Sequence, residues 1–223
     1  MKAVFEGTEF PVIPLSNEAD NVDYDAFVVI PFNSPPRHSV VEIKWNEPDG
    51  GLRKEKQTAV PVEVIDGNYR SEKLTVDGKK IDPPKKVLKR ILAEQKEIGA
   101  IYRKIGKEKL WSGPFILPLD SEITSPFGNK RVYNGKMNGF HQGLDLRART
   151  PVPVRSPEGA RVVLAKDLYF TGGTVILDHG YGLFTVYAHM SRLDVKKGDR
   201  LEKGKVLGLS GATGRASGPH LHW

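Results

Sequence analysis

The 223-residue sequence contains no cysteine, and its other shortages narrow the class of protein further. Without cysteine, disulfides, thiolate nucleophiles and cysteine-ligated zinc sites are excluded, so any metal site must use His, Asp and Glu. There is no run of about 18 apolar residues, so no transmembrane helix is predicted. The first residues, MKAVFEGTEF, lack the apolar stretch and cleavage site of a secretory signal. The chain is therefore expected to be either cytosolic or exported by a segment outside this sequence.

Charge is unevenly distributed along the chain, whose formal net charge is +7. Residues 1–110 hold 19 basic and 18 acidic side chains, whereas residues 111–223 hold 15 and 9. A basic second half favours a polyanionic partner such as nucleic acid, an anionic membrane or an acidic wall polymer, although simple solubility is the commoner explanation. No stretch combines dense Lys and Arg with aromatic residues, so nucleic-acid binding is not predicted.

Residues 1–80 are predicted to form a small β-sandwich-like domain. β-branched runs at residues 26–32, 39–45 and 58–65 are separated by turn formers such as SPP and EPDGG. The partial alternation in residues 39–45 is typical of a sheet with one solvated face.

Residues 81–110 are predicted to form a linker helix between the two halves. Asp82 can cap this helix, Pro83 suits its first turn and Gly106 is a suitable end. Such an amphipathic helix usually packs against its own protein, although it could also bind a partner. The apolar residues recur at helical spacing: Val87, Leu88, Ile91, Leu92, Ile98, Ile101 and Ile105.

Residues 111–223 are predicted to form a second β domain of short strands broken by glycine. Residues 195–208 contain two Lys-Gly turns about a strand apart and resemble the hairpin of biotinyl and lipoyl carrier barrels. Because no modifiable lysine stands in a carrier motif at the hairpin tip, this hairpin is interpreted as architecture. Strands are expected at residues 159–165, 173–180, 183–190 and 203–211.

The last residues, SGPHLHW, contain two of the six histidines of the chain. In a strand, His220 and His222 point to the same face and Leu221 to the other. Two imidazoles on one face indicate a metal site, or a metal ligand beside a proton-transfer group. Two surface histidines would give the same pattern, so a third ligand is needed to decide.

His141 supplies the candidate for that third ligand, because Asp145 follows it by four residues in GFHQGLDLRA. The surrounding glycines favour a turn that runs into a strand over a helix, and such a turn can bring both side chains to one point. Two imidazoles and one carboxylate form the ligand set of a catalytic zinc site, which leaves one coordination position open. His38 is assigned to a surface loop, and His179 to a strand-to-turn position.

Three segments together resemble the lysostaphin-type (LytM-like) zinc metallopeptidases: SPFGNKRVYNGKMNGFHQGLDLRA, YAHM and ATGRASGPHLHW. The resemblance covers residues 117–223. It implies an antiparallel β-sheet groove of the LytM/lysostaphin type, a barrel-sandwich with a duplicated hybrid motif. It also implies that His141, Asp145 and His222 bind one zinc ion.

The family's two other active-site histidines fall on His189 and His220. His220 is predicted to act as the general base toward a zinc-activated water, and His189 to stabilise the oxyanion or to assist the base. Tyr133 and Asn134 are candidate substrate-binding residues, and the shaping of a long loop is their alternative role.

The resemblance implies a zinc-dependent endopeptidase whose expected substrate is the peptide cross-link of bacterial peptidoglycan. The protein is expected to be a monomer in the periplasm, cell envelope or extracellular space, with a membrane or divisome partner for its N-terminal domain or helix. A non-catalytic relative that activates another wall hydrolase is the alternative. Because family members usually continue further, the second domain is expected to be truncated at its C-terminal end, with weakened stability or zinc retention.

Overall fold

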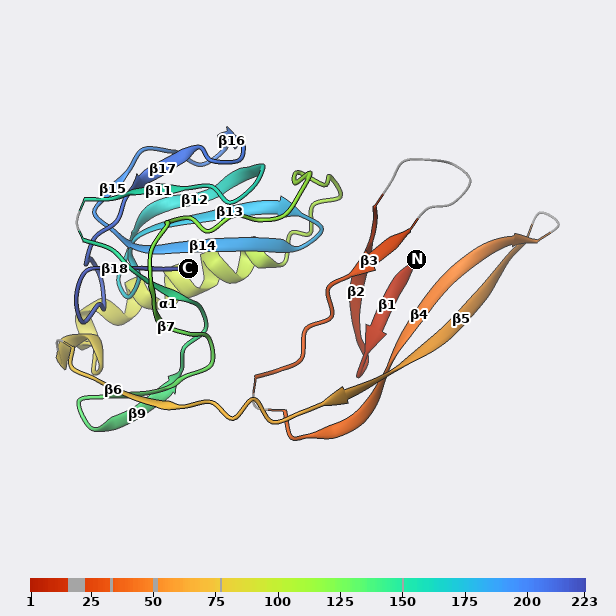
Figure 1. Ribbon diagram of the computed structural model, residues 1–223, viewed down its shortest axis with the longest axis horizontal. Helices are drawn as coiled ribbons and strands as arrows, with labels where there is room; N and C mark the ends of the chain where they lie inside the picture. Colours follow the sequence, from red (N-terminus) through yellow and green to blue (C-terminus); the bar gives the residue numbers. More distant parts are fainter. Residues whose placement is uncertain (16–22, 33, 50–51, 77, 150) are drawn as a thin grey trace. The chain divides into compact units, whose positions relative to one another are not determined.

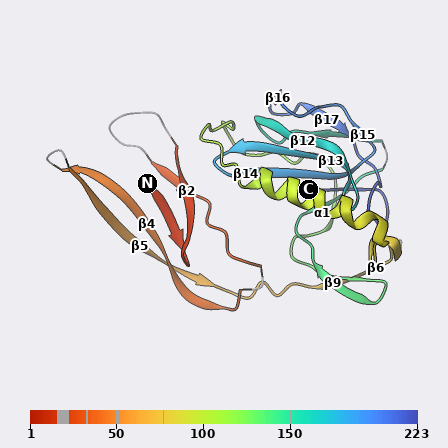
Figure 2. The ribbon, with the colours of Figure 1, turned by 180° about the vertical axis from the view of Figure 1, so that it is seen from behind.

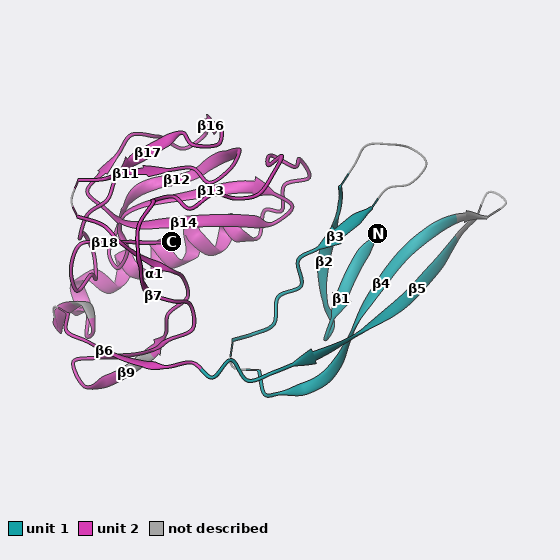
Figure 3. Ribbon diagram, viewed as in Figure 1, with its two compact units in different colours: residues 1–68 teal, residues 69–223 magenta. Residues whose placement is uncertain are grey.

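The computed structural model describes residues 1–15, 23–32, 34–49, 52–76, 78–149 and 151–223. Contacts divide the chain into two compact units, residues 1–68 (unit 1) and 69–223 (unit 2) (Figure 3). The protein is mainly β with largely antiparallel sheets, which confirms the predicted fold class (Figure 1). The three-part division at residues 80 and 110 stays a prediction. Among the described helices, none has the length and apolar character needed to cross a bilayer.

The described residues of unit 1 form a single antiparallel sheet of five strands in the order β3-β2-β1-β4-β5, not the two facing sheets of a sandwich. The β1–β2 hairpin turns at Glu6 and Gly7, whose φ angles of 50° and 81° match a tight two-residue turn. Its small core is formed by Ala3, Phe5, Val41 and Val64. The strands are β1 (Lys2–Phe5), β2 (Thr8–Pro14), β3 (Tyr24–Ala26), β4 (Arg37–Asp49) and β5 (Leu52–Val64).

The strand predictions for unit 1 are right in two places and wrong in one. β4 contains the predicted run 39–45, and β5 contains nearly all of the run 58–65. The run 26–32 is not a strand beyond Ala26, and its Val29 is 66% exposed. Val28 still packs against the core of unit 1, but beyond Ala26 no described strand pairs with this run, and a β-branched run becomes a strand only where it finds a partner. In the EPDGG turn, residues 50–51 lie outside the described residues.

Unit 2 contains one large sheet with strand order β16-β12-β13-β14-β18-β10-β7 and two small ones, β11-β17-β15 and β6-β8-β9. The strands of the large sheet are β7 (Ile123–Ser125), β10 (Asp145–Arg147), β12 (Ala160–Leu168), β13 (Gly172–Gly180), β14 (Leu183–Met190), β16 (Arg200–Leu201) and β18 (His220–His222). The small sheets contain β11 (Pro153–Arg155), β15 (Arg192–Leu193), β17 (Val206–Leu209), β6 (Ser71–Leu74), β8 (Lys130–Tyr133) and β9 (Lys136–Phe140). The short 3-10 helix η1 (Gly78–Lys80) follows β6.

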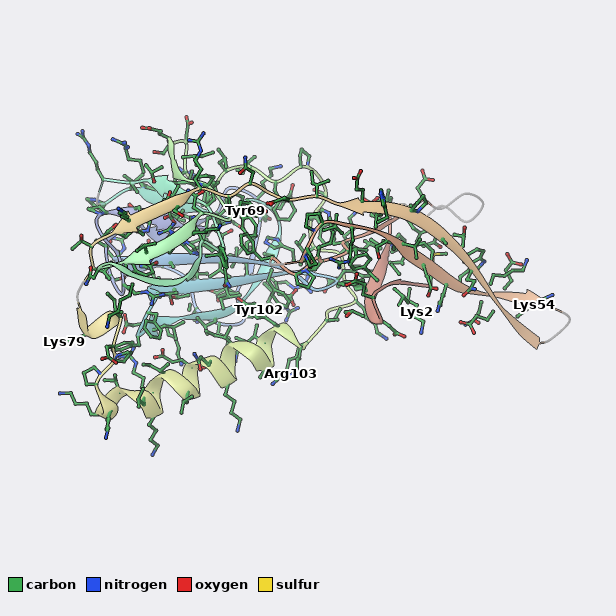
Figure 4. The ribbon with its side chains drawn as sticks, turned by 90° about the horizontal axis from the view of Figure 1, so that it is seen from below. Lys2, Lys54, Tyr69, Lys79, Tyr102 and Arg103 are labelled. Carbon is green, nitrogen blue, oxygen red and sulfur yellow. The ribbon has the colours of Figure 1, made fainter. Side chains whose placement is uncertain are left out.

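Helix α1 (Lys85–Tyr102) packs against the large sheet of unit 2, as both ribbon views show (Figures 1 and 2). Ile98 and Ile101 contact the buried cluster of Leu164, Leu168 and Ile176 on β12 and β13. At the end of the helix, Tyr102 faces the strands (Figure 4), and its ring lies 5.3 Å from that of Phe184. The part of the apolar stripe around Ile98 and Ile101 thus packs against its own unit, whereas Leu88 and Leu92 of the predicted stripe are 43% and 64% exposed.

The predicted ends of the helix are wrong by several residues. The helix begins after Pro84, which is the N-cap with φ −56° and ψ 144° and without a side-chain hydrogen bond, so Asp82 is not the cap. Two consecutive prolines hold this stretch extended and delay the first helical turn. At the other end Arg103 is the C-cap, three residues before Gly106.

The carrier-like hairpin of residues 195–208 is divided between two sheets. Both Lys-Gly pairs lie in turns, as predicted. However, β16 pairs with β12 of the large sheet, whereas β17 pairs with β11 and β15 of a small one. The two strands therefore join layers of unit 2 and do not form a separate hairpin.

Candidate metal centre

The order of strands in the large sheet brings distant parts of the sequence to one place. β18 lies between β14 and β10, so His222 is opposite Asp145 on one side and Ala188 on the other. His220 and His222 share one face of β18, and Leu221 is fully buried in the core on the other face. The strand predicted for HLH is confirmed, and with it the direction of the two imidazoles.

Three side chains converge at this point with their ligand atoms almost in contact. His141 Nε2 lies 2.9 Å from Asp145 Oδ1 and 3.0 Å from His222 Nδ1, and the last two atoms are 2.8 Å apart. His141 stands in the turn before β10, and only 4% of its surface and 6% of that of Asp145 is exposed. This group could hold a metal ion.

The hydrogen bonds around His141 indicate that the three atoms suit a cation. His141 Nδ1 lies 2.8 Å from the carbonyl oxygen of Pro126, which can only accept, so Nδ1 carries the proton. In the neutral ring Nε2 then presents a lone pair to the Asp145 carboxylate and to His222. Lone pairs that face one another in a buried place repel unless a proton or a metal ion lies between them. The donor set of two imidazoles and one carboxylate is that of a catalytic zinc site.

The second oxygen of Asp145 is bound by an arginine. Arg131 Nη2 donates to Asp145 Oδ2 over 2.7 Å, and both side chains are about nine-tenths buried. Burial alone would raise the pKa of Asp145, but its close polar contacts with His141, His222 and Arg131 outweigh burial and hold that pKa far below its usual value. Asp145 is therefore an anion at neutral pH, with Oδ1 directed to the metal centre.

Two further imidazoles flank the three ligand atoms. The ring of His189 lies 4.7 Å from that of His220 and 6.1 Å from that of His222, measured between centroids. His220 Nε2 is 3.7 Å from Asp145 Oδ1. Burial, with a smaller contribution from His220, lowers the pKa of His189 to about 3. All five histidine and aspartate positions singled out in the sequence thus lie in one cluster.

The backbone at His189 is in an unusual conformation. Its φ of 63° lies in the left-handed region, which costs a non-glycine residue about 1–3 kcal/mol. Its backbone N–H donates to Thr171 O, and its ring Nδ1 donates to Thr213 O, each over 2.7 Å. These bonds offset the strain and direct the ring toward His220.

A pocket of about 210 Å³ opens over the cluster. Tyr133 lines it, together with Phe170 and Arg215, whose guanidinium carbon lies 5.0 Å and 4.8 Å from the ring centroids of Tyr133 and Phe170. The side chain of Asn134 instead bonds the backbone N–H and C=O of Val76 at 3.1 and 2.9 Å. The predicted contact of Tyr133 and Asn134 with substrate stays a prediction. The hydrogen bonds of Asn134 fit its alternative role, which is to shape the loop.

The two remaining histidines lie outside the cluster. His38 is exposed, as expected, but it lies on β4 of unit 1, so its assignment to a loop is wrong. His179 is fully buried within β13, where its ring nitrogens bond Gly159 O and Thr185 Oγ1, each at 2.8 Å. It is a packed strand residue with a structural role, so its assignment to a strand-to-turn position was inexact.

Sequence reasoning missed several residues that support the cluster. Ser125 and Arg131 both lie in the SPFGNKR segment used for the resemblance, but no role was assigned to them. Arg215 lies in ATGRASG and was likewise passed over. Glu72, on β6, is far from every recognised motif and carries no sequence signal of its own.

Comparison with known proteins agrees with this geometry. Residues 139–223 match the model of peptidase family M23. A crystal structure of a putative peptidase M23 from Pseudomonas aeruginosa superposes with a TM-score of 0.68 and 30% identity, covering 100% of this chain and 80% of that one. The chain belongs to peptidase family M23.

Two curated relatives extend the likeness. Peptidoglycan DD-endopeptidase ShyA of Vibrio cholerae is 35% identical over 138 residues, which is 60% of this chain and 32% of the relative. An uncharacterized metalloprotease of Haemophilus influenzae is 32% identical over 192 residues, 81% of this chain and 38% of the relative. The chain thus spans about a third of the length of these relatives.

Proposed function

We propose that this protein is a zinc-dependent endopeptidase that hydrolyses peptide cross-links of bacterial peptidoglycan. The single observation that supports this most strongly is the convergence of His141 Nε2, Asp145 Oδ1 and His222 Nδ1 within 3.0 Å of one another below an open pocket. The similarity to a peptidoglycan DD-endopeptidase supports the substrate and favours the D,D-bond over a glycine bridge. The substrate also implies a periplasmic or cell-envelope location.

His141, Asp145 and His222 would hold the zinc ion. When bound, zinc polarises a peptide carbonyl and lowers the pKa of water toward neutrality. Arg131 keeps Asp145 ionised and leaves Oδ1 available, and the Pro126 carbonyl keeps the lone pair of His141 on Nε2. These residues prepare the ligand atoms in advance, so little reorganisation accompanies metal binding.

His220 is the better placed of the two flanking imidazoles to act as general base. Its Nδ1 donates to Gly218 O over 2.8 Å, which leaves a lone pair on Nε2, the atom 3.7 Å from Asp145 Oδ1. That atom can take a proton from a water molecule at the centre, and the carboxylate stabilises the imidazolium that forms. His189, fixed through its own Nδ1, presents its Nε2 in the same way and assists once a proton reaches it.

The test is a digest of purified peptidoglycan sacculi whose muropeptides are resolved by mass, with zinc and with a chelator. We expect cross-linked dimers to disappear with zinc and to persist with the chelator. His141→Ala, Asp145→Ala and His222→Ala should each abolish the zinc-dependent loss of dimers. His38→Ala, which removes an exposed histidine of unit 1, is the matched control and should digest normally.

Two results would contradict the proposal. Full activity in the three ligand variants, with the fold intact, would exclude the metal centre as the site of hydrolysis. Intact dimers in a protein that binds one zinc ion would favour the alternative, a binding protein that activates another wall hydrolase. The presence of both flanking histidines beside a complete ligand set is the reason to favour the enzyme.

A further inference from the structure

Strand β6 runs beside the metal centre although it precedes the M23-matched segment by more than sixty residues. It pairs in parallel with β8, which places Glu72 opposite Arg131. Just before it, the ring of Tyr69 (labelled in Figure 4) covers Gly128, where a Cβ atom would lie 2.2 Å from the ring. Only glycine fits there, so the start of this segment is packed closely against the SPFG turn.

Glu72 makes three polar contacts, all with side chains that are at least nine-tenths buried. Its Oε1 accepts from Asn129 Nδ2 over 2.5 Å, and its Oε2 accepts from Ser125 Oγ over 2.9 Å. The same Oε2 forms an ion pair with Arg131 Nε at 3.3 Å. The Glu72 side chain itself is 22% exposed, so it closes a buried polar cluster from the outside.

Each partner of Glu72 reaches a ligand of the metal centre. Arg131 Nη2 donates to Asp145 Oδ2 over 2.7 Å. The oxygen of Ser125 lies 3.1 Å from His141 Nδ1. The backbone carbonyl of Asn129 accepts from the backbone N–H of His141 over 2.8 Å.

The hydroxyl of Ser125 links Glu72 to the tautomer of His141. Ser125 has a single proton, and it donates that proton to the Glu72 carboxylate. Toward Arg131 and His141 its oxygen can then only accept, which favours the proton of His141 on Nδ1. The lone pair needed for a metal stays on Nε2.

The charge of Glu72 has a second consequence. Arg131 is a buried cation beside Asp145, and an unbalanced cation there would oppose a second positive charge at the centre. Glu72 balances Arg131, so the charge of Asp145 remains available to a metal ion. Partners that fix and balance ligands in this way typically alter metal affinity about 10- to 100-fold.

We propose that Glu72 is a positioning residue of the metal centre, which orients Asp145 through Arg131 and His141 through Ser125. The inference rests on the proposed function, because it assumes that the three ligands bind zinc. By this inference, strand β6, which lies outside the M23-matched residues, helps to position the metal ligands.

The test measures zinc affinity of the full chain by competition with a chromophoric chelator. Glu72→Gln keeps the size of the side chain and removes its charge, and we expect zinc binding to weaken about 10- to 100-fold. The Co²⁺-substituted variant should show a changed visible spectrum, which a purely structural role would leave unaltered. Glu122→Gln is the matched control, because Glu122 pairs with exposed Arg147 on β10, and it should bind zinc as wild type does.

The outcomes separate the inference from the proposed function. Wild-type protein that binds no zinc would overturn the proposed function itself. Wild-type zinc affinity and an unchanged cobalt spectrum in Glu72→Gln would overturn only the role of Glu72. If Glu72→Gln does not fold, Glu72→Asp is the second variant, because its shorter side chain keeps the charge but moves the carboxylate away from Ser125, Asn129 and Arg131. Zinc binding several-fold weaker than wild type is then expected, and equal binding would overturn the inference.

Discussion

Units 1 and 2 are both built mainly from antiparallel strands, but they differ in where their polar side chains lie. In the described residues, every buried polar or charged side chain belongs to unit 2. The ion pairs of unit 1 are partly exposed, as in Lys2–Glu9, whose side chains are 44% and 61% exposed. In unit 2, Arg131 and Asp145 pair with 10% and 8% exposure.

The difference shows where burial of polar side chains lowers the stability of the folded chain. A buried polar group costs free energy unless it is hydrogen-bonded, and most exposed ion pairs contribute little to stability. More than half of the buried polar residues of unit 2 belong to the metal centre or contact it: Ser125, Asn129, Arg131, His141, Asp145 and His189. The polar interior of unit 2 is thus concentrated at one site, whereas the described part of unit 1 has only an apolar interior.

The largest expected effect is on catalysis in unit 2. His220→Ala removes the proposed base without removing a ligand, so we expect zinc to stay bound while the hydrolysis rate falls about 10²- to 10⁴-fold. The rate on sacculi and the zinc content of the same sample are the measurements. A variant that loses both together would mean that His220 acts mainly on metal binding.

Zinc should distinguish the two units in stability. A ligand that binds only the folded state stabilises it by about 4 kcal/mol at 1,000 times its Kd. We therefore expect zinc to protect the backbone amides of unit 2 from hydrogen exchange and to leave those of unit 1 unchanged. Equal protection of the amides of both units from hydrogen exchange would contradict the assignment of the metal centre to unit 2 alone.

Core substitutions should show whether the site depends on its own unit alone. Leu177→Ala, at a fully buried position of β13, is expected to destabilise unit 2 by about 2–5 kcal/mol and to weaken zinc binding. Phe5→Ala, in the small core of unit 1, is expected to cost about 3–5 kcal/mol there and to leave zinc affinity unchanged. Denaturation curves and chelator competition measure both, and reduced zinc affinity in Phe5→Ala would contradict the expectation.

The smallest effect is expected at the surface of unit 2. Lys166 and Glu97 form an ion pair at 2.6 Å between β12 and α1, with side chains 44% and 39% exposed. Lys166→Ala should change the free energy of unfolding by no more than about 1 kcal/mol. A larger loss in chemical denaturation would show that this pair holds the helix on the sheet.

The sequence was most informative where spacing and residue type agreed. HLH could be placed on a strand and HxxxD in a turn before a strand, because the period of a strand and the breaking effect of glycine act locally. The Lys-Gly turns were located for the same reason. These local rules, joined to the family resemblance, were enough to select all five residues of the cluster.

What could not be predicted depends on contacts between distant segments. The run 26–32 has the composition of a strand, but in the part of the chain that the structure describes it pairs with another strand only at Ala26, and nothing in its own residues shows this. Glu72 reaches the centre only because β6 pairs with β8, and a parallel pairing across some sixty residues leaves no local pattern. The unusual backbone of His189 likewise depends on carbonyls of Thr171 and Thr213 from other loops.

The most direct test of the central claim is a crystal structure of the zinc-soaked protein with anomalous data collected at the zinc absorption edge. We predict one anomalous peak, from a zinc ion that lies about 2.0–2.2 Å from His141 Nε2, Asp145 Oδ1 and His222 Nδ1. We also predict that the peak disappears in Asp145→Ala. A peak at another set of residues, or full retention of the ion in that variant, would contradict the central claim.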